Sequence, residues 1–431
     1  MSKAFLLGTL EIVRVKDTED LLVTGYGKGK VGAGTAVYAV NAGDDYPASA
    51  LFRISEVYVV EDSKMVSVDE AEDRVMTIKI EKGIHYRFRR GTVLYTREAE
   101  NKEISDTYLN ALGNSFVRTL KLDIREVELN ILSVTDLFEI CRLNGFLLAE
   151  KGESLTEEEK ATNKERLKTV FDKLCEKILN VDGIYCLYSR VTNEPFLFTN
   201  VLKKKEGFLC TPLNIRLIPI AYRDKFAKEY PNDKYEFRLI KNGESRTGIR
   251  DFLYEAFYCN GADGVEIVSA QTPISKDTLV KRDESESAVT NPDSLKWMLL
   301  LAEQGKPEND GEKLNNNLYF QFMCMNLIKG KFLIPARLEG SESTEGGMLT
   351  PGKDDKIMFA TQPGKDGKPA VRMYTDLKHF NASYPGESYV VQGMDRLIEK
   401  FDAAVNVGQG QKAVGYITKD LYDKCKAVKD K

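Results

Sequence analysis

The first candidate for chemistry is Gly27-Lys28-Gly29-Lys30-Val31-Gly32, which has the spacing GxGxxG. In dinucleotide-binding proteins this spacing is followed by a helix, because the pyrophosphate binds at a helix N-terminus. Here it is followed by residues 35–40, which alternate as a strand does. The pair Gly29-Lys30 also precedes Val31 rather than Ser or Thr, so it is not a P-loop. The sequence therefore favours a turn between strands, and we expect no cofactor.

Histidine is scarce, since the chain has only His85 and His379. A Ser-His-Asp or Cys-His site needs a histidine base, and a zinc site needs several ligands. His85 lies in a basic strand, and we expect His379 in a helical turn at the surface, with no orienting group that the sequence identifies. The 66 acidic residues offer no pair that spacing singles out. We therefore predict no catalytic residue and no metal ligand.

A third candidate is a group of basic residues near the turns of the N-terminal strands, interleaved with Tyr26, Tyr86 and Phe88. Such a pattern can bind single-stranded RNA. Because acidic residues lie nearby, the sequence favours a charged strand edge, with RNA contact as the alternative. The group consists of Lys28, Lys30, Arg87, Arg89, Arg90 and Arg97, and RNA contact would run through Lys28, Lys30, Arg89 and Arg90.

Composition restricts the class of protein. A length of 431 residues with 42% hydrophobic residues predicts two to four domains with real cores. The net charge of −4 provides no general attraction to DNA or to an anionic membrane. No apolar run approaches the roughly 20 residues that cross a bilayer. The seven cysteines are scattered and never spaced CxxC, which favours reduced thiols and a cytoplasmic protein.

The elements that must position these residues fall into two kinds. Residues 1–98 contain many short apolar runs separated by glycine and charged turns, which predicts an all-β barrel domain. Residues 99–164 have helical periodicity and form a mostly helical connector. At its end, Thr156 and Glu159 form a capping box, followed by an apolar stripe that we expect to face a core.

The second half of the chain contains an internal repeat. Phe171, Leu174, Cys175 and Leu179 match Phe320, Met323, Cys324 and Ile328, and the helical turn before Tyr230-Pro231 matches the one before Tyr384-Pro385. The order of segments predicts helices on a mixed sheet, an α+β fold, in both copies. We place the copies at residues 165–280 and 312–431, joined by a linker, 281–311, that contains a short helix.

Two resemblances follow from these segments. Residues from about 8 to 97 resemble the second domain of elongation factor Tu, through Gly27-x-Gly29-Lys30-Val31-x-x-Gly34 and the closing run 90–94. The nucleotide domain of that family is missing, so GTP hydrolysis is not implied. The repeated copies resemble the SseB (serine-sensitivity-enhancing) family, through the runs 331–335, 371–376 and 413–417. That family supplies no catalytic residue to transfer.

The sequence thus predicts a multi-domain cytoplasmic protein in which an all-β barrel precedes two α+β SseB-like modules. We expect a non-enzymatic binding or scaffolding protein with protein partners, because three domains offer several docking faces. One alternative is a translation-associated factor that contacts RNA or the ribosome through the barrel. Another is an enzyme that uses a pocket between the modules.

Overall fold

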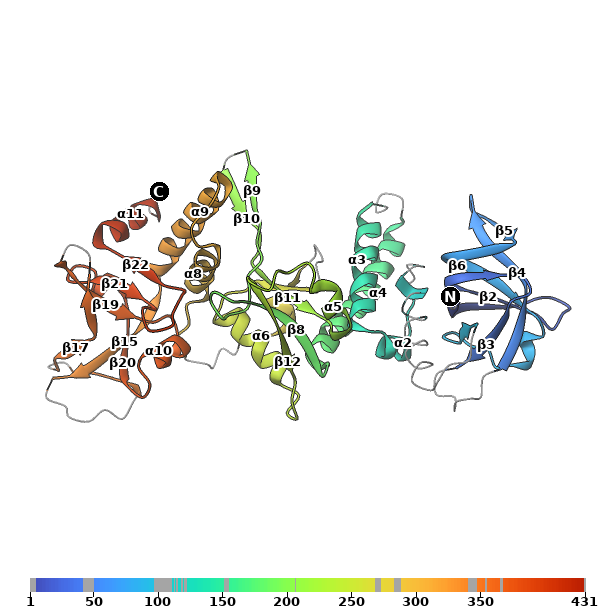
Figure 1. Ribbon diagram of the computed structural model, residues 1–431, viewed down its shortest axis with the longest axis horizontal. Coiled ribbons are helices and arrows are strands. Elements are labelled where there is room, and N and C mark those ends of the chain that lie inside the picture. Colours follow the sequence, from blue (N-terminus) through green and yellow to red (C-terminus); the bar gives the residue numbers. More distant parts are fainter. Residues whose placement is uncertain are drawn as a thin grey trace. The chain divides into compact units, whose positions relative to one another are not determined.

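The computed structural model describes residues 5–41, 50–96, 111, 113, 115–117, 119, 122–150, 155–205, 207–267, 273–282, 288–339, 347–352, 355–364 and 367–429. The chain is a multi-domain α+β protein with two compact units, Met1–Ile178 and Leu179–Lys431 (Figure 1). Of the basic residues named above, Arg97 lies outside the described residues.

The first unit begins with an antiparallel sheet in the order β3-β7-β1-β2-β6-β4-β5. Since β3 also pairs with β4, this sheet nearly closes as a ring. Strands form here because side chains alternate between the two faces, and one face is apolar. The inner face holds fully buried residues such as Leu7, Val23 and Ile78. The strands are β1 (Leu6–Arg14), β2 (Leu21–Gly32), β3 (Ala36–Val40), β4 (Ala50–Glu61), β5 (Lys64–Val68), β6 (Glu70–Ile80) and β7 (Val93–Tyr95).

The glycine-rich segment is part of strand β2, not the turn that we predicted; the turn comes later, at residues 33–35. Every second residue of β2 is buried, and three of these inward positions are Gly25, Gly27 and Gly29. A Cβ atom on Gly25 would lie 2.2 Å from the Gly8 carbonyl oxygen, and one on Gly27 would lie 2.6 Å from a methionine methyl. The glycines therefore permit close packing inside the ring, and the next element is the strand β3.

Three helices with defined bounds follow the sheet: α2 (Glu126–Ile131), α3 (Val134–Glu150) and α4 (Glu157–Asn180). The predicted capping box at α4 is confirmed. The Thr156 N–H donates to the Glu159 carboxylate at 2.8 Å, and the Glu159 N–H donates to the Thr156 hydroxyl at 3.2 Å. The Ser115 hydroxyl donates to the Gly8 carbonyl at 2.6 Å and so connects the helical segment to the sheet.

Besides the hairpin β9–β10, the second unit contains a five-stranded sheet in the order β12-β8-β11-β13-β14. It also contains two four-stranded sheets, β16-β20-β15-β17 and β18-β19-β21-β22. The bridge between Leu333 and Tyr374 joins β15 to the end of β19, so the strands β20-β15-β19-β21-β22 follow an order that corresponds to the five-stranded sheet. In both sets of five strands only the third and fourth are parallel, and their neighbours are antiparallel. The strand order that the internal repeat requires is therefore present in both copies.

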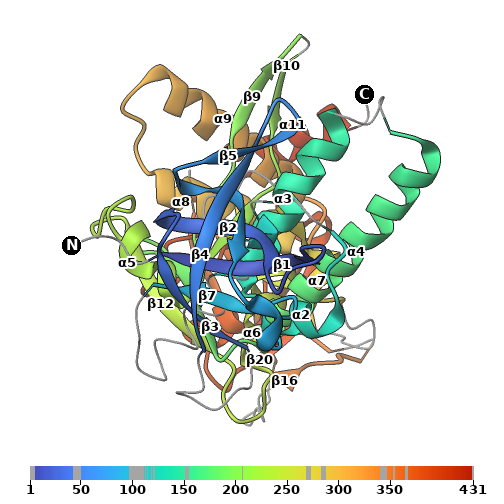
Figure 2. The same ribbon diagram turned by 90° about the vertical axis from the view of Figure 1, so that its right-hand side faces the viewer.

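We call residues Gly183–Leu279 the first repeat. It contains β8 (Gly183–Ser189), β9 (Val201–Lys204), β10 (Gly207–Cys210), β11 (Asn214–Ile218), α5 (Arg223–Phe226), β12 (Tyr235–Lys241), α6 (Gly248–Tyr258), β13 (Gly264–Ile267), β14 (Ile274–Ser275) and α7 (Lys276–Leu279). The hairpin β9–β10 forms its own two-stranded sheet and extends away from the main sheet (Figure 2).

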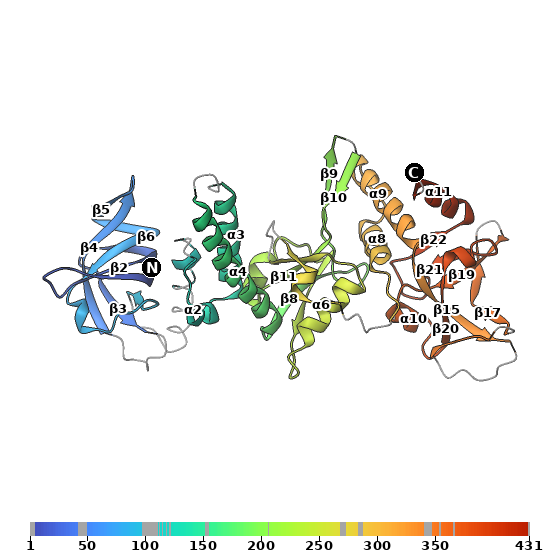
Figure 3. The same cartoon turned by 180° about the vertical axis from the view of Figure 1, so that it is seen from behind.

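We call residues Asp310–Lys429 the second repeat. It contains α9 (Asp310–Leu327), β15 (Lys331–Leu338), β16 (Gly347–Met348), β17 (Ile357–Phe359), β18 (Thr361–Pro363), β19 (Pro369–Met373), α10 (Leu377–Ser383), β20 (Ser388–Gly393), β21 (Asp402–Val405), β22 (Gly415–Ile417) and α11 (Lys419–Lys429). The helix predicted in the linker is α8 (Pro292–Gln304), which starts with a proline at its first turn. Helix α9 packs between α8 and α11 (Figure 3).

Equivalent side chains make equivalent contacts in the two repeats. Arg216 donates to the Tyr230 hydroxyl at 2.8 Å, and Arg372 donates to the Tyr384 hydroxyl at 3.1 Å. The aromatic cores also correspond, because Phe226 with Tyr230 and Phe380 with Tyr384 occupy matching places. The two tyrosines of the Tyr-Pro pairs therefore make the same kind of contact in both repeats, as the predicted equivalence requires.

Candidate functional site

The predicted basic patch lies on the N-terminal sheet, but its residues differ in exposure and in whether they form ion pairs. Lys28 is exposed on β2, and Lys30 forms an ion pair with Glu70. Lys28 is opposite Leu6 at the start of β1, whereas Arg89 and Arg90 precede Gly91, which bonds to Thr9. The two lysines and the two arginines therefore lie at different levels of the ring.

Arg90 is engaged within the protein. Its guanidinium lies 2.8 Å from the Glu128 carboxylate, 3.2 Å from the Asp123 carboxylate and 5.0 Å from the centre of the Phe116 ring. Glu128 is only 3% exposed, so this pair is buried and joins the sheet to helix α2. Arg90 thus stabilises the first unit and offers little to a phosphate. This contact gives the RNA interpretation less support than the spacing alone did.

The second histidine belongs to a buried pair at the start of α10. His379 is 5% exposed, which corrects the surface position that we predicted. Its Nδ1 lies 2.8 Å and 2.9 Å from the two oxygens of Asp376, the helix N-cap. Burial alone would raise the pKa of Asp376, but hydrogen bonds and the charge of His379 outweigh it, so this pKa is lowered. An aspartate three residues before the histidine was the signal in the sequence.

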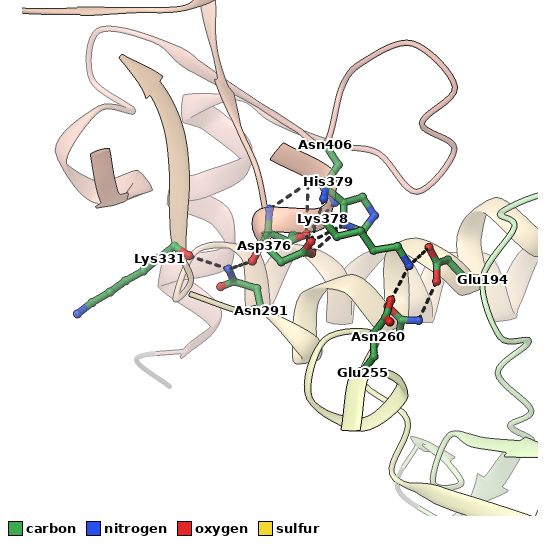
Figure 4. Close-up of polar contacts among 10 residues, drawn as sticks. Glu194, Glu255, Asn260, Asn291, Lys331, Asp376, Lys378, His379 and Asn406 are labelled. Atoms are coloured by element: carbon green, nitrogen blue, oxygen red, sulfur yellow. Dashed lines mark hydrogen bonds and ion pairs between the residues drawn. The ribbon is translucent and has the colours of Figure 1, made fainter. Parts of the chain in front are cut away.

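Other polar groups complete this pair. The Thr375 hydroxyl donates to Asp376 at 2.7 Å, and the Asn406 side-chain amide donates to the Thr375 hydroxyl at 2.9 Å. The Asn291 amide donates to the carbonyl oxygens of Lys331 and Thr375 at 2.7 and 2.8 Å (Figure 4). Every oxygen of Asp376 therefore has a protein partner, which fits a structural role.

A cavity of about 610 Å³ lies beside this pair, between the two repeats. The lining includes Glu194, Arg238, Glu255 and Cys259 from the first repeat and Asp376 and Lys378 from the second. Its size is within the range of small-ligand sites, which is about 300–1,000 Å³. His379 does not line it. The ring of His379 would therefore not contact a ligand bound in this cavity.

Lys378 bridges the two repeats across this cavity. Its amino group lies 2.6 Å from Glu194 and 2.7 Å from Glu255, and Asn260 donates to Glu194 at 3.0 Å (Figure 4). Burial lowers the pKa of Lys378, but the two carboxylates raise it by more, so this pKa lies above its ordinary value. A nucleophilic lysine needs a lowered pKa. Lys378 is therefore suited to stabilise the contact between the repeats through its ion pairs, and it is not suited to act as a nucleophile.

Three buried cysteines are poorly suited to act as nucleophiles. Burial raises the pKa of the Cys175 thiol to about 11 and those of Cys141 and Cys324 to about 12. A nucleophilic cysteine needs the opposite shift. Within the described ranges, no group of three or more His, Cys, Asp or Glu side chains could hold a metal ion. No helix in the described part of the chain is both long and apolar enough to span a bilayer.

The hairpin β9–β10 exposes apolar side chains. Leu202 is opposite Leu209, and the next pair is Lys203 with Phe208. The exposed fractions of Leu202, Phe208 and Leu209 are 43%, 41% and 50%. No other strand among the described residues pairs with either edge of this hairpin. A two-stranded ribbon is marginally stable in water, so free edges beside exposed apolar residues favour a binding partner.

Comparisons with known proteins add no identity. No family model and no curated protein matches the chain. The resemblances to the second domain of elongation factor Tu and to the SseB family therefore rest on the motifs quoted above.

Proposed function

We propose that this chain is a cytoplasmic, non-enzymatic binding or scaffolding protein that docks on a protein partner through the hairpin β9–β10. The observation that carries the proposal is the exposure of Leu202, Phe208 and Leu209 on a ribbon with two unpaired edges within the described residues. Such an edge can accept a strand of a partner, while the apolar side chains supply affinity. The exposed residues Lys203, Lys204 and Lys205 at the tip favour a partner with acidic groups around an apolar patch.

The absence of enzymatic activity is part of the proposal. Its support is that Lys378 has a raised pKa and that the oxygens of Asp376 are occupied by protein donors. The fold assignment is likewise a proposal: the nearly closed antiparallel ring is compatible with a barrel like the second domain of elongation factor Tu. The shared strand order of the two repeats is compatible with tandem SseB-like modules.

The test is affinity capture from native lysate, with and without nuclease, using the full chain. The test variant replaces Leu202, Phe208 and Leu209 with serine. Its matched control replaces Val60, Met65 and Val66 with serine, because they form another exposed apolar group on paired strands, with exposed fractions of 62%, 57% and 38%. Truncating central apolar anchors costs more than about 1 kcal/mol each, so the hairpin variant should lose its partner at least tenfold.

The captured partner is then purified, and its dissociation constant is measured for all three proteins. Equal affinity for wild type and the hairpin variant would show that the hairpin is not the docking surface. If capture disappears with nuclease instead, the RNA alternative gains support. That alternative would then be tested with Lys28→Gln and Lys30→Gln, because each lost phosphate contact lowers the salt slope by about one.

A further inference from the structure

A second cavity, of about 340 Å³, lies at the base of the hairpin and is separate from the one that Lys378 crosses. Its lining combines four aromatic side chains with three carboxyl groups. The rings are those of Phe196, Phe198, Tyr235 and Tyr319, and the carboxyl groups are those of Glu303, near the end of α8, Glu308 and Glu312. Its volume is at the lower end of small-ligand sites.

The rings of Phe196, Phe198 and Tyr235 form one cluster. The centres of Phe196 and Phe198 are 4.7 Å apart, and those of Phe196 and Tyr235 are 4.8 Å apart, with their planes inclined at 51° and 63°. The Arg216 guanidinium covers Phe198 at 3.8 Å, and its charge is paired with Glu266 at 2.9 Å. Rings inclined to one another can present their electron-rich faces to a cation from more than one side.

Glu303 has an unused oxygen. One carboxyl oxygen accepts from the Thr192 hydroxyl at 3.3 Å, whereas the other, Oε2, is inaccessible to solvent and forms no hydrogen bond of normal geometry. Burial raises the pKa of Glu303 well above its usual range, and the charge of Glu194 adds to this effect, whereas contacts with the Thr192 hydroxyl and the Leu197 backbone partly offset it. A buried polar atom without a partner costs free energy, and a ligand would remove that cost.

The charges at the edge of the cavity largely cancel. Lys234 and Lys306 are exposed, and Glu308 and Glu312 lie on the same edge. Among the three carboxyl groups of the lining, that of Glu303 has an oxygen that is inaccessible to solvent. A carboxylate enclosed by aromatic rings is suited to a cation, because the ring faces and the negative charge attract it together.

We propose that this cavity binds an alkylammonium ligand, held by the rings of Phe196 and Tyr235 and by the carboxylate of Glu303. The ligand's positive charge favours the carboxylate form of Glu303, so binding releases to the solvent whatever proton the raised pKa keeps on this group. This site is independent of the hairpin surface, so the two proposals can fail separately.

The experiment is isothermal titration calorimetry of the full chain at pH 7 with choline and with n-butylammonium, each compared with its neutral isostere. Repeating the titration in buffers of different ionisation enthalpy counts the protons released. We expect at least one of the two cations to bind, its neutral isostere to bind at least tenfold more weakly, and the binding of the cation to be accompanied by a release of protons.

Glu303→Gln keeps the shape of the side chain and removes its charge, so the variant should fold, lose at least tenfold in affinity and release no proton. Glu308→Gln, at the exposed edge, is the matched control and should retain both the affinity and the proton release. Binding of neither cation, equal binding of a cation and its isostere, or unchanged binding by Glu303→Gln would overturn the proposal. Tighter binding of acetate than of either cation would also overturn it.

Discussion

Replacing Arg90 with glutamine should destabilise the first unit far more than replacing its predicted partner in the basic patch, Lys28. The arginine side chain is 19% exposed and pairs with Glu128, which is 3% exposed. Removing one partner of a buried pair costs about 3–5 kcal/mol when the other charge is left alone. Glu128 keeps Arg125, whose guanidinium lies 2.6 Å away, so the cost should be smaller.

The magnitude follows from the separate contacts. Loss of one of the two positive partners of Glu128 should lower the free energy of unfolding by about 2 kcal/mol. Loss of the ion pair with the half-exposed Asp123 should lower it by at most about 1 kcal/mol. The sum is roughly 2–3 kcal/mol, or about 30- to 150-fold in the opening equilibrium. Lys28 is exposed and has no ion pair among the described residues, so Lys28→Gln should change stability by less than about 0.5 kcal/mol.

The assay is native-state hydrogen exchange measured by mass spectrometry, on peptides that contain β1 and β7. Trp297, the single tryptophan, belongs to the second unit, and its fluorescence checks that this unit remains folded. The double variant Arg90→Gln/Glu128→Gln should regain at least half of the stability that Arg90→Gln loses, because it no longer contains the buried carboxylate that lacks its partner. Equal protection of β7 in wild type and Arg90→Gln, or equal damage from Lys28→Gln, would refute the reasoning.

The remaining predictions concern the second unit, followed by urea unfolding with Trp297 fluorescence. Arg216→Met should lower the free energy of unfolding by about 2–3 kcal/mol, because it leaves the charge of Glu266 unpaired. The equivalent Arg372→Met should lower it by about 1 kcal/mol, because the main loss is one hydrogen bond. Equal losses in the two variants would contradict this. Asp376→Asn should lower the free energy of unfolding by about 1–3 kcal/mol at pH 7. Because the pKa of Asp376 is lowered in the folded state, the difference in stability between wild type and variant should disappear as the pH falls below about 4. The Glu303→Gln variant should be more stable than wild type at pH 7 and about equally stable near pH 4. The reason is that the raised pKa of Glu303 in the folded state lowers the stability of wild type as the pH rises above about 4.3. A difference in stability that does not change with pH would disprove this.

Local and periodic features could be predicted from the sequence. The capping box of Thr156 and Glu159 forms within one helical turn, so three residues of spacing determine it. The internal repeat was visible because equivalent positions, such as Tyr230 and Tyr384, keep the same residue type in the same order. The alternation of residues 35–40 also identified a strand and ruled out a helix after the glycines.

Predictions about single side chains were less successful than those about helices and strands. His379 was expected at the surface because its orienting group was not recognised, although Asp376 stands only three residues earlier. Arg90 looked like a free base in its strand context, and only packing against α2 shows that Glu128 occupies it. The glycines of β2 were expected in a turn, but the inner face of a narrow ring also requires the smallest side chain.

The sequence by itself determined the classes of element, the repeat and the scarcity of catalytic residue types, because these depend on residue type and on neighbours within one or two turns. The tertiary structure decided which charges meet. Lys378 contacts Glu194 and Glu255 of the other repeat, and Glu303 is enclosed beside the rings of Phe196 and Tyr235. Burial and partner distance set the pKa and availability of such groups, and both depend on contacts between segments that are far apart along the chain.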